Sequence, residues 1–180
     1  QLIEDILSEM NDKKAYASRR CEEIMFENDK FGINILGTIE EAKNLTSEQV
    51  TKAWQELLKS AHIEITVIGK ASYESIISEF KNRFAKINRQ PQEMLKTKVK
   101  EKAEEIKEIT ENMDVSQCKL VMGLCAGTAY PDKDTCAMMV MNALFGGTAQ
   151  SKLFLNVREK LSLCYYCSSR YNKAKGVIFI

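Results

Sequence analysis

Arg158 and Tyr165 stand seven residues apart in a segment that reads V-R-E-K-L-S-L-C-Y-Y-C. A guanidinium and a phenol that lie together can hold a peptide carbonyl or a carboxylate through directed hydrogen bonds. The residue pattern predicts that Arg158 lies in the last turns of a helix, that residues 160–162 bend, and that Tyr165 lies near the start of the next strand. Such a connection can bring both polar tips to one edge of a sheet, so the pair is a candidate substrate-binding site.

The same segment contains a C-x-x-C, Cys164 and Cys167, a spacing that serves redox dithiols and zinc sites. Those roles need two neighbouring sulfurs, which a turn or a helix N-terminus provides. The surrounding residues predict a strand, on which positions i and i+3 point to opposite faces about 10 Å apart. A disulfide needs Cα atoms within about 7 Å of each other. We therefore expect neither a redox nor a zinc role.

No complete catalytic set is present. A zinc hydrolase motif needs two histidines and a glutamate on a helix, and the chain has a single histidine, His62, before an expected strand. Gly146-Gly147-Thr148 lacks the Lys-Ser/Thr of a phosphate-binding loop and indicates the end of one helix before the next. The Lys/Glu-rich stretch 96–108 is typical of a solvated surface.

The composition of the 180 residues, with 44% hydrophobic and 28% charged, is that of a globular protein. No apolar run of about 18 residues predicts a membrane span, and no signal peptide is recognisable. A net charge of +1 gives no reason to expect nucleic acid or membrane partners. Six cysteines without a secretion signal indicate reduced thiols and a cytoplasmic location.

The elements that must position these residues are helices and a few strands. Apolar spacing predicts two helices within 1–27 (the first with Ile3, Ile6, Leu7 and Met10 on one face, the second over 14–26), and further helices over 47–60 (capped at Thr46 or Ser47) and 73–84. Later helices are expected at 131–144 and 151–160, and strands at 63–69, 118–124, 163–170 and 176–180. The fold class is α+β, with helices packed on mixed or antiparallel sheets.

The chain divides into three parts by composition. Residues 1–88 are expected to be the later part of one α+β domain, 89–112 a charged connector, and 113–180 the first part of a second domain. The chain begins inside a helix and ends within a strand, which indicates a fragment of a longer protein.

Two sets of motifs resemble one family. L-F-G-G…S-K-L-F-L-N-V-R-E-K…L-C-Y resembles a block of the insulinase/pitrilysin-like zinc peptidases, and D-K-K-A-Y-A, G-T-I-E, L-T and V-I-G resemble earlier segments in the same order. In that family one domain carries the zinc motif, and a second, similar domain carries an Arg and a Tyr that face the zinc across a closed chamber. The resemblance implies that Arg158 and Tyr165 hold the substrate backbone and help stabilise the oxyanion.

The departures from the family pattern concern the metal. The zinc motif is absent, and the family's third ligand, a glutamate, would fall near Glu4 and Asp5, where the register favours Asp5 or no ligand. Cys where relatives have Ala makes the L-C-Y-Y-C segment most similar to a bacterial branch that lacks the zinc motif. The resemblance thus implies a non-catalytic subunit with no cofactor of its own, a peptide substrate, and a partner subunit that supplies zinc.

Two other interpretations stay open from the sequence. The chain could be a fragment of an active zinc metallopeptidase whose zinc motif lies upstream, or a binding module without a peptidase role. In each case we expect the 180-residue chain alone to cleave no peptide.

Overall fold

A computed structural model describes all residues from Gln1 to Ile180. It contains two compact units, one formed by Gln1–Ile39 with Thr97–Ile180 and the other by Glu40–Lys96. The division into domains 1–88, 89–112 and 113–180 stays a prediction. None of the helices is both long enough and apolar enough to cross a membrane.

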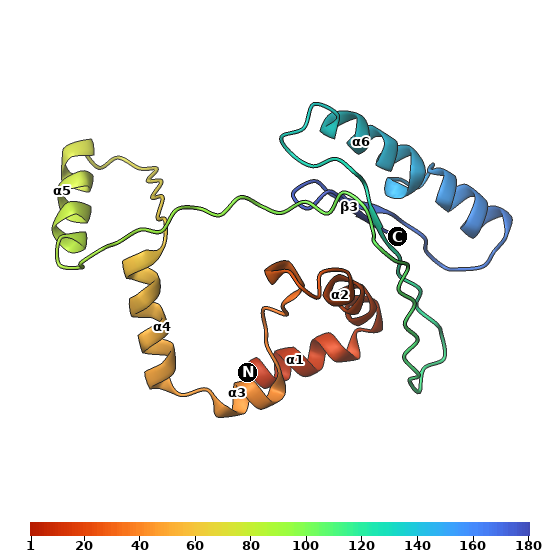
Figure 1. Cartoon of the computed structure of the whole chain (residues 1–180), viewed down its shortest axis with the longest axis horizontal. Helices are drawn as coiled ribbons and strands as arrows, with labels where there is room; N and C mark the ends of the chain where they lie inside the picture. Colours follow the sequence, from red (N-terminus) through yellow and green to blue (C-terminus); the bar gives the residue numbers. More distant parts are fainter. The chain divides into compact units, whose positions relative to one another are not determined.

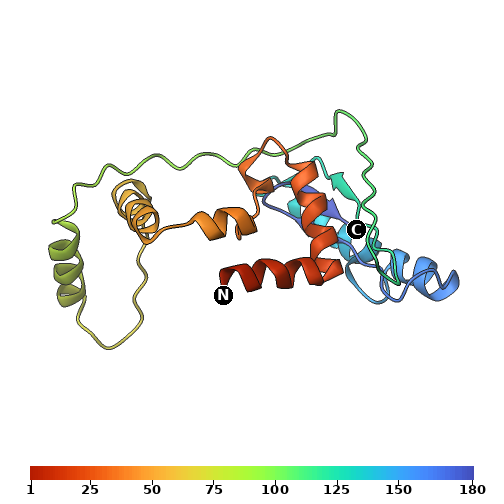
Figure 2. The same cartoon turned by 90° about the horizontal axis from the view of Figure 1, so that it is seen from below.

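The first unit begins with two packed helices, α1 (Leu2–Asn11) and α2 (Lys13–Met25), as the apolar spacing predicts (Figure 2). Asp12 lies between them, and its carboxylate accepts hydrogen bonds from the amides of Lys14 and Ala15 at 3.0 and 3.1 Å. This cap satisfies amides that a helix N-terminus otherwise leaves unpaired. Ile6 on the predicted apolar face of α1 is buried.

The sheet of this unit has three antiparallel strands in the order β1-β3-β2. They are β1 (Gly123–Cys125), β2 (Arg170–Asn172) and β3 (Val177–Phe179), and all three residues of the central strand β3 are buried. Figure 1 shows α2 and α6 (Thr135–Asn142) on opposite sides of β3. Helices on an antiparallel sheet confirm the predicted α+β class.

The core joins the two ends of the chain. Phe26 at the end of α2 packs with Val177 and Phe179 of β3. The short 3₁₀ helix η1 (Lys30–Gly32) carries Phe31, which meets Phe26 edge to face with ring centroids 4.9 Å apart. Lys175, in the turn before β3, places its ammonium 2.7 Å from the carboxylate of Asp29.

The helices before the candidate site are confirmed but begin later than predicted. α6 continues directly into a π-helical turn, η2 (Ala143–Gly147), and a second π-helical segment, η3 (Phe154–Lys160), follows. Gly146 is buried at the end of η2, where it adjoins Ser169 just before β2.

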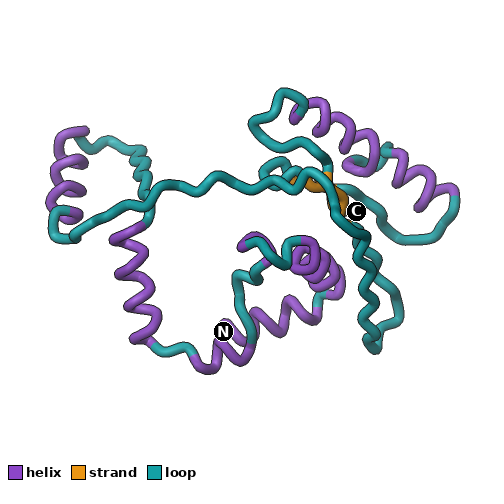
Figure 3. Tube along the Cα trace, in the orientation of Figure 1, coloured by secondary structure: helices purple, strands orange, loops and turns teal.

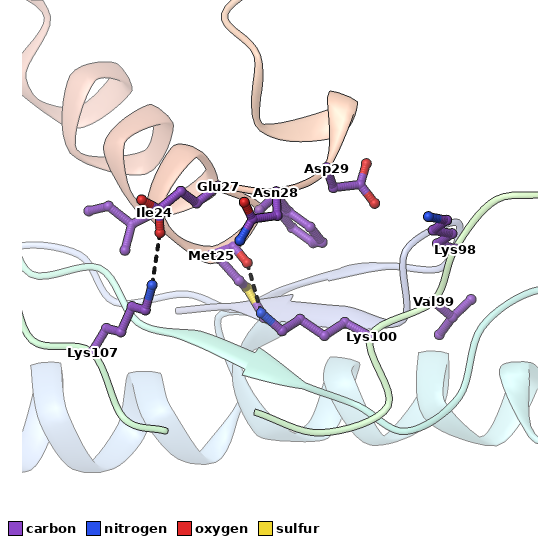
Figure 4. A pocket seen from close by; sticks show the side chains of 10 residues that line it. Ile24, Met25, Glu27, Asn28, Asp29, Lys98, Val99, Lys100 and Lys107 are labelled. Carbon is purple, nitrogen blue, oxygen red and sulfur yellow. Dashed lines mark hydrogen bonds and ion pairs between the residues drawn. The ribbon is translucent and has the colours of Figure 1, made fainter. Parts of the chain in front are cut away.

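A stretch of the predicted connector is fastened to α2. Lys100 donates to the Met25 carbonyl at 3.1 Å and Lys107 pairs with Glu27 at 2.9 Å, and all four residues line an open pocket of about 230 Å³ (Figure 4). Glu111 accepts hydrogen bonds from Arg20 and Tyr16, both at 2.8 Å. These donors, Arg20 first, hold the pKa of Glu111 below its usual value.

The second unit contains α4 (Ser47–Ser60) and α5 (Tyr73–Phe84), with the bounds that the sequence predicts, and most of the short α3 (Ile39–Asn44). Thr46 caps α4 in a reciprocal capping box with Gln49, and Ser72 caps α5. Local signals of this kind specify helices well, since capping and i→i−4 bonds involve only nearby residues.

The strand predictions are mostly wrong. The predicted strand 63–69 does not form, and the predicted strands 118–124 and 163–170 are reduced to β1 and β2 (Figure 3). Alternating apolar residues make a strand only where a neighbouring backbone pairs with them, and β3 is the shared partner of β1 and β2. The predicted strand 176–180 is confirmed as β3.

Candidate functional site

Arg158 lies in the last turns of η3, as predicted, and its guanidinium reaches across the following bend. Its Nε donates to the backbone carbonyl of Tyr165 at 3.0 Å. The guanidinium also lies 4.9 Å from the ring centroid of Phe154 and pairs with Glu159. Phe154 was not predicted as part of this site, although its i, i+4 spacing from Arg158 on a helix is a signal for such a contact.

Tyr165 is therefore fixed through its backbone and not through its phenol. The residue is 82% exposed, and no hydrogen bond joins its hydroxyl to Arg158. The structure brings the two predicted residues together through the Tyr165 carbonyl, while the Tyr165 phenol is exposed and the Arg158 guanidinium is half-exposed. That Arg158 and Tyr165 hold a substrate backbone stays a prediction.

The segment that carries Tyr165 is fixed at both ends and lacks backbone partners between them. Ser162 adopts a φ of 51°, and its amide donates to the Arg158 carbonyl at 3.1 Å. At the other end, the Ser169 amide donates to the Gly146 carbonyl at 2.8 Å. No backbone amide of residues 164–168 donates to a backbone carbonyl. Side-chain contacts must therefore hold the middle of this segment.

The separation of Cys164 and Cys167 predicted from strand geometry is wrong. Their segment is irregular, and the two half-buried thiols interact. Burial, and then the proximity of Cys164 with its hydrogen bond, raises the pKa of the Cys167 thiol. A raised pKa favours the neutral thiol over the thiolate that attacks disulfides or binds metals.

The chain has no ligand set that fits zinc. No group of three or more histidine, cysteine, aspartate or glutamate residues gathers closely enough to hold a metal ion. His62 instead contacts Glu64 at 3.1 Å. Glu4 and Asp5 lie exposed in the first turn of α1. No metal-dependent step can be assigned to these residues.

We expect the purified chain to bind zinc at well below one equivalent, since Cys164 and Cys167 supply two ligands where structural zinc sites use four. Elemental analysis after dialysis against zinc measures this. Stoichiometric zinc that disappears in Cys164→Ser would contradict the expectation.

The family to which this α+β fold belongs follows from its similarity to known proteins. Residues 44–180 match the family profile described as peptidase M16 inactive domain. The chain belongs to the peptidase M16 family, which confirms the insulinase-like resemblance.

Individual relatives agree with this assignment. The probable inactive metalloprotease YmfF of Bacillus subtilis (strain 168) is 31% identical over 170 residues, which cover 94% of this chain and 40% of that protein. The uncharacterized zinc protease SCO5738 of Streptomyces coelicolor (strain ATCC BAA-471 / A3(2) / M145) is 25% identical over 151 residues, 78% of this chain and 32% of that protein. The chain thus spans less than half the length of these curated relatives.

A solved structure shares the fold. The crystal structure of a conserved protein from Enterococcus faecalis V583 superposes with a TM-score of 0.90 at 28% sequence identity, covering 99% of this chain and 42% of that chain.

Proposed function

We propose that this chain is part of a non-catalytic peptidase M16 subunit that holds the backbone of a peptide substrate opposite the zinc site of a partner subunit. Arg158 and Tyr165 are the residues in contact with substrate. The assembly works in the cytoplasm and hydrolyses peptides, with zinc supplied by the other subunit. The match to the inactive M16 domain and the name of the Bacillus subtilis relative support the non-catalytic assignment.

One observation carries the proposal: Arg158 holds the Tyr165 carbonyl while the Tyr165 phenol stays 82% exposed. The phenol is thereby presented to solvent on a fixed backbone. The Nε and Nη1 atoms of Arg158 have partners within the chain, which leaves Nη2 as a donor for a substrate carbonyl. A phenol and a guanidinium N–H can together orient an extended peptide and stabilise charge on its reacting carbonyl.

The test is cleavage of a quenched-fluorescent peptide by this subunit assembled with its proposed zinc-bearing partner subunit. We expect Arg158→Ala and Tyr165→Phe each to lower kcat/KM about tenfold, since each removes a hydrogen bond to a group that gains charge. Tyr130→Phe is the matched control, because Tyr130 is also a strongly exposed tyrosine, at 70%, and it makes no contact with Arg158 or Tyr165. If Arg158→Ala and Tyr165→Phe both leave kcat/KM unchanged, the proposed substrate-binding role is wrong.

A second candidate, an active zinc metallopeptidase, is favoured by the name of the Streptomyces coelicolor relative. In that case the gene's complete product, purified without a partner, would retain one zinc equivalent and cleave the same peptide. The first proposal expects zinc and cleavage only in the presence of the second subunit.

A further inference from the structure

The side chain after Tyr165 is held by cations from two other segments. The ammonium of Lys14 lies 4.3 Å from the ring centroid of Tyr166, and that of Lys119 lies 5.9 Å away. Lys14 belongs to the first turn of α2, whereas Lys119 precedes β1. Both distances lie within the range of cation–π attraction.

Lys14 lies at an electrostatically unfavourable position, since cations destabilise a helix N-terminus. The first turn of α2 contains no acidic residue, and its cap is Asp12. The neighbouring Lys13 donates instead to the carbonyl of Met10 at 2.9 Å. Contact with the Tyr166 ring supplies a compensating interaction for the Lys14 charge.

We infer that Tyr166 is a positioning residue for Tyr165, clamped by Lys14 and Lys119. Because residues 164–168 lack backbone pairing, side-chain contacts determine the position of this segment. Arg158 fixes the Tyr165 carbonyl, and the clamp fixes the adjacent ring. Two anchors on consecutive residues restrict the direction in which the exposed Tyr165 phenol projects. This inference rests on the proposed substrate-binding role of Tyr165.

The direct test is ¹⁹F NMR of the chain labelled with 3-fluorotyrosine at its six tyrosines, with the Tyr165 signal assigned by its loss in Tyr165→Phe. We expect Lys14→Gln and Tyr166→Leu to shift and sharpen the Tyr165 signal, because the phenol becomes more mobile. Tyr166→Phe keeps the aromatic ring and should therefore leave the Tyr165 signal as in the wild type. Lys13→Gln, whose lysine contacts Met10, is the matched control and leaves the signal in place.

The same variants are measured for peptide cleavage in the two-subunit assembly. We expect Lys14→Gln to lower kcat/KM about threefold, which is the effect of losing one cation–π contact at an exposed site. Tyr166→Phe should have a kcat/KM close to that of the wild type, because it keeps the ring. A Tyr165 signal that is identical in Lys14→Gln, Tyr166→Leu and the wild type overturns the inference. If the signal moves while Arg158→Ala and Tyr165→Phe leave cleavage unchanged, the clamp is correct and the proposed function fails.

Discussion

Replacing Asp29 by alanine is expected to lower the free energy of unfolding of the first unit by about 3 kcal/mol, since it leaves a buried ammonium without its half-buried carboxylate partner. The ammonium that loses its partner belongs to Lys175, which is 5% exposed. Its remaining neighbours, the rings of Phe26 and Phe31, have centroids 5.2 and 5.4 Å away and do not replace a carboxylate. Lys175→Met should cost less, because the new side chain is apolar among these rings.

Hydrogen exchange of β3 amides measures this loss within the unit concerned. The fluorescence of the single tryptophan, Trp54, is unsuitable because Trp54 lies in α4 of the other unit. Lys173→Met is the matched control, since Lys173 is exposed in the same turn as Lys175. Protection of β3 unchanged in Asp29→Ala would show that the ion pair contributes little.

The pair also predicts a pH dependence. The hydrogen bond from Lys175, followed by that from the Phe31 amide, lowers the pKa of Asp29 in the folded state. A lowered folded-state pKa gives stability that is present above the unfolded-state value, about 3.9, and is lost as pH falls through the folded-state value. The difference in unfolding free energy between the wild type and Asp29→Asn should therefore shrink below about pH 4.

Gly146→Ala is the second substitution with a large expected effect, a loss of about 3 kcal/mol through overpacking. A Cβ at this position would lie 2.5 Å from Ser169 Oγ and 2.7 Å from Leu153 Cδ1. Ser169 cannot easily retreat, since its amide donates to the Gly146 carbonyl and its hydroxyl donates to Asn142 Oδ1, both at 2.8 Å. The same bonds fix the end of the segment that carries Tyr165.

Thermal unfolding followed by circular dichroism measures the stability of this variant, and the Tyr165 ¹⁹F signal reports the site. Gly69→Ala is the control, because no atom lies within 4 Å of a Cβ built there. If Gly146→Ala unfolds at the wild-type temperature, the tight contact is relieved by small movements and the packing argument is wrong.

Helices were predicted better than strands, because a helix depends on residues close in the sequence whereas a strand needs a partner strand. Thr46 and Gln49 cap α4 within four residues of sequence, and the apolar face of α1 follows the helical repeat. The alternation in 63–69 is as regular, yet it specifies a strand only if another backbone pairs with it. The predicted strand 176–180 forms as β3, Val177–Phe179, because two neighbours, β1 and β2, pair with it from both sides.

The amino-acid sequence alone predicted the longer helices, the cap of α4 at Thr46, the α+β class and the pairing of Arg158 with Tyr165 as the candidate site, because these depend on local spacing and on family motifs. The tertiary structure decided which Arg158 atom meets which Tyr165 atom, that Cys164 and Cys167 lie near each other, and that Lys14 reaches Tyr166. Lys14 and Tyr166 are 152 positions apart in the sequence, and only the folding of the intervening chain brings a cation to a ring over such a separation.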